Sequence, residues 1–140
     1  MKSPGKKRSK KNMIYLDANV VLRYLLADDV EQHIISKNVI DGSPNIFIME
    51  GVVVEIVYVL TKTYEIEREL VGEQLVELFE QKRFCFENKS LIIEALNILK
   101  KSSLDFVDCL LCACKNLKNV EVFTFDKKLL KCLEKEKSQQ

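Results

Sequence analysis

The sequence predicts an α/β protein built around a central, mainly parallel sheet of four to five strands with helices on both faces. The prediction rests on one pattern: short apolar runs that read as buried strands alternate with longer segments whose apolar residues recur at helical spacing. Parallel strands need such crossover helices between them, and a parallel sheet is buried on both faces. The chain has 140 residues, which suits one folded domain.

Four short apolar runs provide the predicted strands. The first ends at Asp17, and the second follows the helix-breaking triplet Gly-Ser-Pro at residues 42–44. The third alternates around Phe84 and Phe86, and the fourth ends at Asp126. These strands occupy residues 13–16, 45–49, 83–87 and 121–125.

Seven segments have the apolar spacing of a buried or amphipathic helix. The polar pair Asp28-Asp29 separates the first two, and Ser102-Ser103 links the fifth to the sixth. The helices occupy residues 18–27, 30–40, 50–64, 67–81, 90–101, 105–118 and 127–135. The predicted order is therefore β-α-α-β-α-α-β-α-α-β-α, the alternation that a parallel α/β sheet requires.

Charge is distributed unevenly along the chain. Residues 1–12 carry six Lys or Arg and no acid, and we predict a disordered basic tail there, followed by a single domain over residues 13–140. The remainder carries 16 basic and 21 acidic residues, unlike a basic RNA-wrapping domain. No apolar run reaches the roughly 18 residues of a membrane span, and the first apolar segment contains charged residues that a signal peptide excludes. We therefore expect a cytoplasmic protein without membrane contact.

Five cysteines are present, three of them as C-x-x-C-x-C at Cys109, Cys112 and Cys114. A zinc site normally has four ligands, and the only histidine, His33, is far away in sequence. Because the cluster lies in an apolar helical stretch, we interpret these residues as buried thiols in a reducing compartment rather than as metal ligands.

Two acids fall where parallel strands are predicted to end. Asp17 closes the first strand and Asp126 the fourth, and the chemistry of open parallel sheets lies outside the carboxyl ends of their strands. Aspartate is also a preferred helix N-cap, so each residue taken alone could serve only as a cap.

Two further acids lie on predicted helices. The neighbours of Glu55 at helical spacing are all uncharged, which predicts a carboxylate among apolar groups that needs a compensating cation, unless this face meets solvent. Asp105 fits an N-cap, which places Asp108 in the first helical turn, where an acid also favours the helix dipole.

Taken together, the four carboxylates indicate a metal site. Acids gathered in one crevice repel one another unless cations lie between them. A donor set of oxygens alone suits Mg²⁺ or Mn²⁺, which activate water and stabilise charge in phosphodiester cleavage. The predicted ligands and catalytic residues are Asp17, Glu55, Asp108 and Asp126.

Four motifs carry a family resemblance. The segment IYLDANVVLRYLL at residues 14–26 resembles the opening motif of PIN-domain ribonucleases, particularly VapC-type toxins. So do VVVEIVYVL around Glu55, LDFVDCLL at residues 104–111, and TFD at residues 124–126. The motifs occur in the family's order and spacing. One departure is that Ala18 stands where threonine is commoner.

The resemblance implies a PIN-like three-layer fold and metal-dependent endoribonuclease activity. It also implies an RNA substrate, a homodimer and inhibition by a small antitoxin protein. On the same basis Asp17, Glu55 and Asp108 match the defining acids, Asp126 the fourth acid, and Asn19 and Thr124 the supporting polar positions. Alternatives are a stand-alone RNA-processing PIN nuclease and a catalytically silent PIN-like interaction module.

A phosphotransfer enzyme of the dehalogenase type is a rival from another class. Its first strand also ends in an aspartate, but it needs a second one two residues later, where this chain has Asn19.

The presence of all four acids argues against the catalytically silent PIN-like module, because an inactive module is expected to lack at least one of them.

Overall fold

The computed structural model describes residues 12–138 of the chain. The basic tail predicted for residues 1–12 therefore lies, except for Asn12, outside the described residues. The chain divides into two compact units. The first contains Met1–Ile56 and Gln81–Glu87, and the second contains Val57–Glu80 and Asn88–Gln140.

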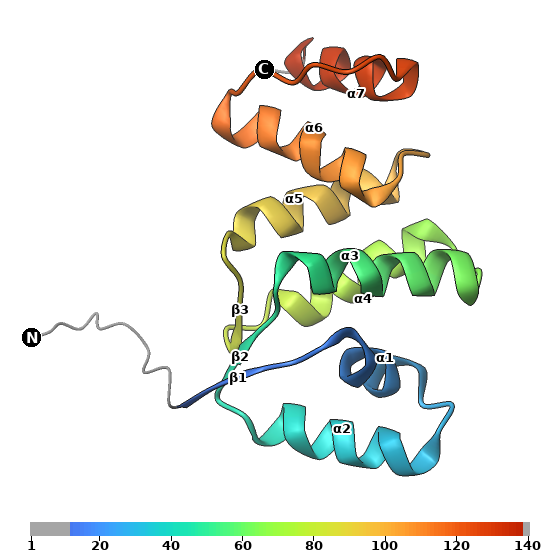
Figure 1. Cartoon of the computed structure of the whole chain (residues 1–140), viewed down its shortest axis with the longest axis vertical. Coiled ribbons are helices and arrows are strands. Elements are labelled where there is room, and N and C mark those ends of the chain that lie inside the picture. The colour runs from blue at the N-terminus through green and yellow to red at the C-terminus, as the bar shows by residue number, and fades with distance from the viewer. Residues whose placement is uncertain (1–11, 139–140) are drawn as a thin grey trace, which may run out of the picture. The chain divides into compact units, whose positions relative to one another are not determined.

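The first unit holds the sheet. Strands β1 (Met13–Tyr15), β2 (Asn45–Phe47) and β3 (Phe84–Cys85) pair in the order β1-β2-β3, and both pairings are parallel (Figure 1). Helices α1 (Ala18–Leu26) and α2 (Val30–Gly42) pack against each other and connect β1 to β2. The predicted α/β class with a parallel sheet is thus confirmed.

The core of this sheet is centred on its middle strand. The register places Ile46 opposite Ile14 on one side and opposite Phe84 on the other. Ile46 and Phe84 are buried, whereas Ile14 and Tyr15 of β1 are 37% and 56% exposed. Strand β1 is therefore the more exposed edge of the described sheet.

Helix α3 (Glu50–Tyr58) follows β2 and passes from the first unit into the second. The helix predicted over residues 50–64 ends as a π-helical turn, η2 (Val59–Thr63). The Thr61 hydroxyl donates to the Val57 carbonyl at 2.8 Å, one of the local bonds in this widened turn. Such turns interrupt α-helices and often mark functional sites.

The second unit is helical over its described residues. It contains α4 (Arg68–Phe79), α5 (Lys89–Lys100), α6 (Phe106–Lys118) and α7 (Lys127–Ser138). Helix α5 packs against α4 and α6, and α6 packs against α7 (Figure 1). No helix among residues 12–138 combines the length and apolar character needed to cross a membrane.

Helix α5 shows why these segments are helical. The side chain of Asn88 caps it by accepting the Leu91 N–H at 3.1 Å. Its apolar residues then recur on one face, and burial of each large one contributes roughly 1.5–3 kcal/mol. At Gly72, where α4 meets α5, a Cβ atom would lie 2.2 Å from Cγ of Lys100, so the glycine permits the close approach.

The predicted fourth strand is wrong within the described residues. The chain over residues 121–125 has no regular secondary structure, and the described sheet has three strands instead of four to five. Alternating apolar residues give a segment strand propensity, but a strand also needs a neighbour that accepts its backbone hydrogen bonds. Here Phe123 and Phe125 are 84% and 87% exposed, and their rings pack on each other at 5.2 Å.

Candidate metal site

Asp17 lies directly after β1, at the start of α1. The Leu16 N–H still bonds the Phe47 carbonyl of β2 at 3.3 Å, so strand pairing extends to the residue before the acid. Asp17 has an extended backbone, and its Oδ1 accepts the Val20 N–H at 3.2 Å, as a helix cap does. Its Oδ2 accepts no bond from another described residue, so one oxygen stays available for a ligand.

A cavity of about 310 Å³ lies beside Asp17 in the first unit. Asn19 lines the same cavity, together with residues of α1 and α2. One of those residues, Arg23, has its guanidinium 2.7 Å from Asp28. Asn19 is thus in a position to contact a ligand held by Asp17, although no hydrogen bond between the two side chains is present.

Glu55 corrects one expectation. Its side chain is exposed, so the expected burial among apolar groups is wrong. The buried face of α3 contains Val53, Ile56 and Val57, whereas Glu55 lies on the solvent side with Tyr58, which is 60% exposed. Water hydrates this carboxylate, and its charge does not by itself demand a metal ion.

Three acids of the second unit, Asp105, Asp108 and Asp126, interact electrostatically. Asp108 is half-buried in the first turn of α6, and Asp105 occupies the cap position before it without a side-chain cap bond. Burial raises the pKa of the Asp108 carboxyl, and the negative charges of Asp126 and Asp105 raise it further. Among the described residues, no basic side chain forms an ion pair with Asp108.

Asp126 is held on both sides by hydrogen bonds. Its Oδ1 accepts the Leu129 N–H at 3.0 Å and so caps α7. Its own N–H donates to Oγ1 of Thr124 at 3.0 Å, so the threonine fixes the backbone at the acid. As at Asp17, the second carboxylate oxygen accepts no hydrogen bond from a described residue.

The donor chemistry of these residues fits a hard divalent cation. All four side chains offer oxygen, and both capping aspartates keep one oxygen unengaged. However, within residues 12–138 no group of three or more His, Cys, Asp or Glu side chains is placed around one point to hold a metal ion. The structure therefore brings together Asp108 and Asp126 in one unit, and leaves Asp17 and Glu55 in the other.

Comparison with known protein families shows which family the chain belongs to. Residues 14–133 match the PIN domain family. The chain belongs to this family. It is also similar to a protein named VapC ribonuclease from Aquifex aeolicus (strain VF5), with 30% identity over 101 residues, covering 70% of this chain and 75% of the relative. No solved structure gives a significant match.

The PIN match confirms the resemblance that the motifs predicted. It runs through residues of both units and includes all four acids. The cap bonds of Asp17 and Asp126 also confirm the simpler interpretation of these residues as N-caps. Capping a helix does not prevent Asp17 or Asp126 from binding a metal ion, because the cap bond uses only one carboxylate oxygen of each residue.

The five cysteines of this PIN domain form no disulfide. Cys109 and Cys112 are buried, as the sequence predicted, whereas Cys114 of the same cluster is only half-buried. Burial raises the pKa of the Cys109 thiol to about 11, although its contact with Ser102 opposes the shift. A neutral thiol is a poor nucleophile and a poor metal ligand, so Cys109 serves packing.

Sequence reasoning missed one organising residue of the PIN domain. Arg68 of α4 donates from Nε to the Ser102 carbonyl at 2.8 Å and from Nη2 to the Leu104 carbonyl. It thereby fixes the link that leads to Asp105 and Asp108. The interaction spans more than 30 residues of sequence, so no local pattern indicates it.

Proposed function

We propose that this PIN domain is an endoribonuclease that hydrolyses RNA phosphodiester bonds with the help of Mg²⁺ or Mn²⁺. Family membership supports a nuclease, and the similarity to a protein named VapC ribonuclease supports RNA as the substrate. The observation that carries the proposal is that Asp108 is half-buried, has no basic ion-pair partner among the described residues, and has a pKa that burial and the charges of Asp126 and Asp105 raise. A divalent cation is the natural counter-charge for such a group.

In this proposal Asp17, Glu55, Asp108 and Asp126 hold the metal ion. Asn19 and Thr124 are supporting residues, the first in the cavity beside Asp17 and the second bonded to the Asp126 backbone. A bound ion of this kind activates water and stabilises the charge that develops on the phosphate. The chain orients two of these carboxylates through the helix caps at Asp17 and Asp126.

We further propose that the chain is the toxin of a type II toxin–antitoxin pair. The name of its relative supports this role. The partners would be cellular RNA, a small antitoxin protein and a second copy of the chain in a homodimer, all in the cytoplasm. Growth arrest on expression in a bacterial host, relieved by co-expression of an antitoxin, is the expected result.

The decisive experiment is cleavage of single-stranded RNA by purified protein. We expect cleavage with Mg²⁺ or Mn²⁺, none in EDTA, and a loss of about 100-fold or more in Asp17→Asn, because even outer-shell partners of a metal contribute about 10–100-fold. Asparagine keeps the helix cap and removes the charge, so the variant should stay folded. Near-normal activity of folded Asp17→Asn at saturating metal would exclude Asp17 as a ligand. Absence of metal-dependent cleavage by the wild type would favour a silent interaction module.

A further inference from the structure

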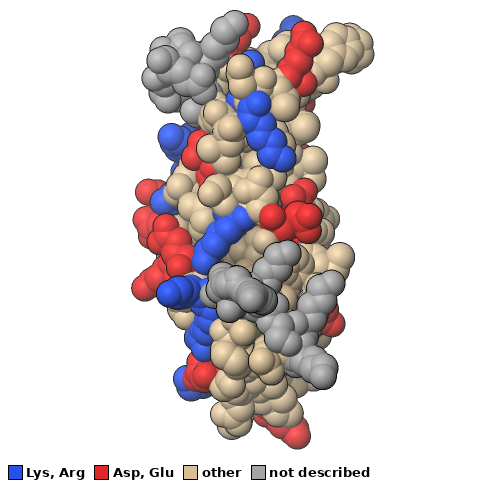
Figure 2. All heavy atoms as spheres, turned by 90° about the vertical axis from the view of Figure 1, so that its left-hand side faces the viewer, with Lys and Arg blue, Asp and Glu red and all other residues tan. Residues whose placement is uncertain are grey.

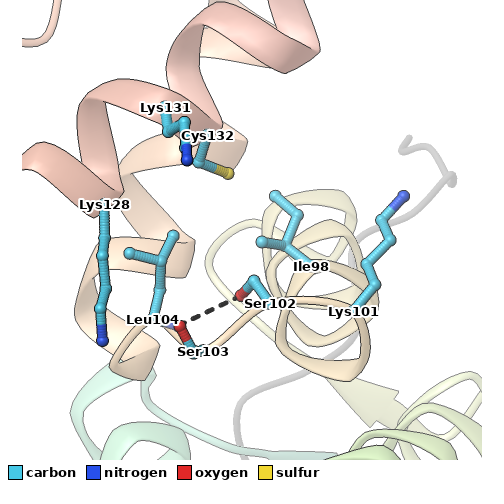
Figure 3. A pocket seen from close by; sticks show the side chains of 8 residues that line it. All are labelled: Ile98, Lys101, Ser102, Ser103, Leu104, Lys128, Lys131 and Cys132. Carbon is cyan, nitrogen blue, oxygen red and sulfur yellow. Dashed lines mark hydrogen bonds between the residues drawn. The ribbon is translucent and has the colours of Figure 1, made fainter.

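A cavity of about 380 Å³ opens in the second unit, apart from the acids discussed above. It lies between the end of α5, the link before α6, and α7 (Figure 3). At about 30 Å³ for each water, it has room for a phosphate group and its remaining hydration. Its lining consists of Ile98, Lys101, Ser102, Ser103, Leu104, Lys128, Lys131 and Cys132.

The charged side chains around this cavity are all cations. Lys128 and Lys131 extend from α7, and Lys101 extends from the end of α5 (Figure 3). None of the three forms an ion pair with a described residue, and no described acid lines the cavity. All three lysines are exposed, so their ammonium groups can reach an anion bound in the cavity, and no described acid there competes for them.

The positive lining is a local feature. On the face drawn in Figure 2, acidic and basic side chains are interspersed and form no broad field of one sign. A general attraction to polyanions would need a basic surface, whereas a cavity with cations on its rim recognises a single anionic group. Lys128 also lies in the first turn of α7, where a positive charge is unfavourable to the helix dipole, so helix stability does not explain it.

One wall of the cavity is held in place by hydrogen bonds. Arg68 binds the carbonyls of Ser102 and Leu104, and Oγ of Ser102 accepts the Leu104 N–H at 3.3 Å. Figure 3 shows this last bond as a dashed line between Ser102 and the backbone at Leu104. The Ser103 hydroxyl next to it bonds no described residue and can donate to an anion. A rigid wall lowers the ordering cost of binding.

We propose that this cavity binds a backbone phosphate of the RNA strand, held by Lys128, Lys131 and the Ser103 hydroxyl. The proposal rests on the endoribonuclease function proposed above. RNA is favoured over other anions because the cavity walls continue the two segments that carry the acids: Ser103 lies two residues before Asp105, and Lys128 two residues after Asp126. A strand cut at these acids presents further phosphates beside them.

The test is binding of labelled single-stranded RNA in EDTA, which prevents metal-dependent cleavage. Each lysine that neutralises a phosphate of a single strand contributes about 0.7 to the salt dependence of log K. Lys128→Gln with Lys131→Gln should therefore lower that slope by about 1.4 and weaken binding several-fold at low salt. The matched control is Lys115→Gln with Lys118→Gln, which removes the same charge at the same spacing from α6.

The outcomes separate this proposal from the proposed function. If the pocket variant binds RNA with the slope and affinity of the control, or wild type binds no RNA, the phosphate site is wrong even where wild type cleaves RNA with metal. If the slope falls but wild type never cleaves RNA, the phosphate site stands and the nuclease function fails. Lysine-dependent binding of AMP with unchanged RNA affinity would overturn the assignment to RNA. Thermal melting of both variants verifies that they are folded.

Discussion

Two carboxylates of this protein, one in each unit, lie in opposite electrostatic surroundings. In the first, Asp41 lies 2.8 Å from Nζ of Lys37, and the hydrogen bond from that lysine lowers the Asp41 pKa. In the second, Asp108 has no cationic partner among the described residues, and burial together with the charges of Asp126 and Asp105 raises its pKa. The surroundings of Asp41 favour its charged form, whereas those of Asp108 make its charged form less favourable.

The difference separates scaffold from site. A surface carboxylate that pairs with a lysine contributes little to stability, and its charge is already balanced without a ligand. Partly buried charges without an ion-pair partner often indicate a functional site, because a bound ligand can supply the missing counter-charge. The second unit gathers unpaired charges of both signs, the acids around Asp108 and the lysines around the cavity at α7.

The largest effect that tests this comparison is stabilisation by metal. If the four acids together bind one metal ion, Mn²⁺ should stabilise the folded wild type, because the ion binds only the folded state. At about 100 times the dissociation constant, the free energy of unfolding should rise by roughly 2.7 kcal/mol. Glu55→Gln should melt like the wild type in EDTA, because Glu55 is exposed, but should gain less from Mn²⁺. Thermal denaturation of both proteins in EDTA and in Mn²⁺ measures the difference.

Asp41→Asn is the control from the first unit. It removes a carboxylate that is already paired with Lys37, so its small loss should be the same in both buffers. A wild type that ignores Mn²⁺, or a Glu55→Gln variant destabilised equally with and without it, contradicts the shared site.

A smaller effect on the free energy of unfolding distinguishes Asp17, which makes a cap bond, from Asp105, which makes none. Asp17→Ala removes the side-chain bond to the Val20 N–H and should cost about 1 kcal/mol in EDTA, whereas Asp17→Asn should be nearly neutral. Asp105→Ala should cost less than Asp17→Ala, since Asp105 makes no cap bond at α6. Chemical denaturation of the three variants checks the order. Equal losses at Asp17 and Asp105 would mean that the observed cap bond contributes nothing.

Local features of the fold were predictable because their causes are local. The helix expected at residues 90–101 is found at Lys89–Lys100, where Asn88 caps it and its apolar face is buried. The positions of Asp17 and Asp126 at helix starts followed from residue type and spacing alone. A cap needs only three or four consecutive residues, so the sequence contains the whole interaction.

The features that failed depend on distant partners. Glu55 has uncharged neighbours, yet spacing identifies only a helix and not which side of it is packed. The alternating residues 121–125 have the composition of a strand, but the described sheet supplies them no partner. Arg68 and the lysine-lined cavity join segments more than 20 residues apart, and no short motif encodes such a contact.

The most delicate test of the comparison is the titration of Asp108 itself. Its folded pKa is raised, so the folded state binds this proton more tightly than the unfolded chain does. In EDTA this group therefore adds stability at low pH, and the contribution is lost as pH rises through the folded pKa. Metal needs the charged form, so metal binding should weaken on acidification at a higher pH than for an ordinary aspartate.

The neighbours of Asp108 decide how far its titration moves. Asp126→Asn keeps the cap on α7 but removes the larger of the two neighbouring charge effects, so it should lower the Asp108 pKa more than Asp105→Asn does. Neither variant should restore the ordinary value, because burial is the largest cause and remains. Carboxyl NMR titration of the three proteins in EDTA measures this order, with Asp41 as an internal reference. If neither substitution moves the Asp108 titration, these acids do not interact, burial alone sets the pKa, and the contrast between the units loses its electrostatic basis.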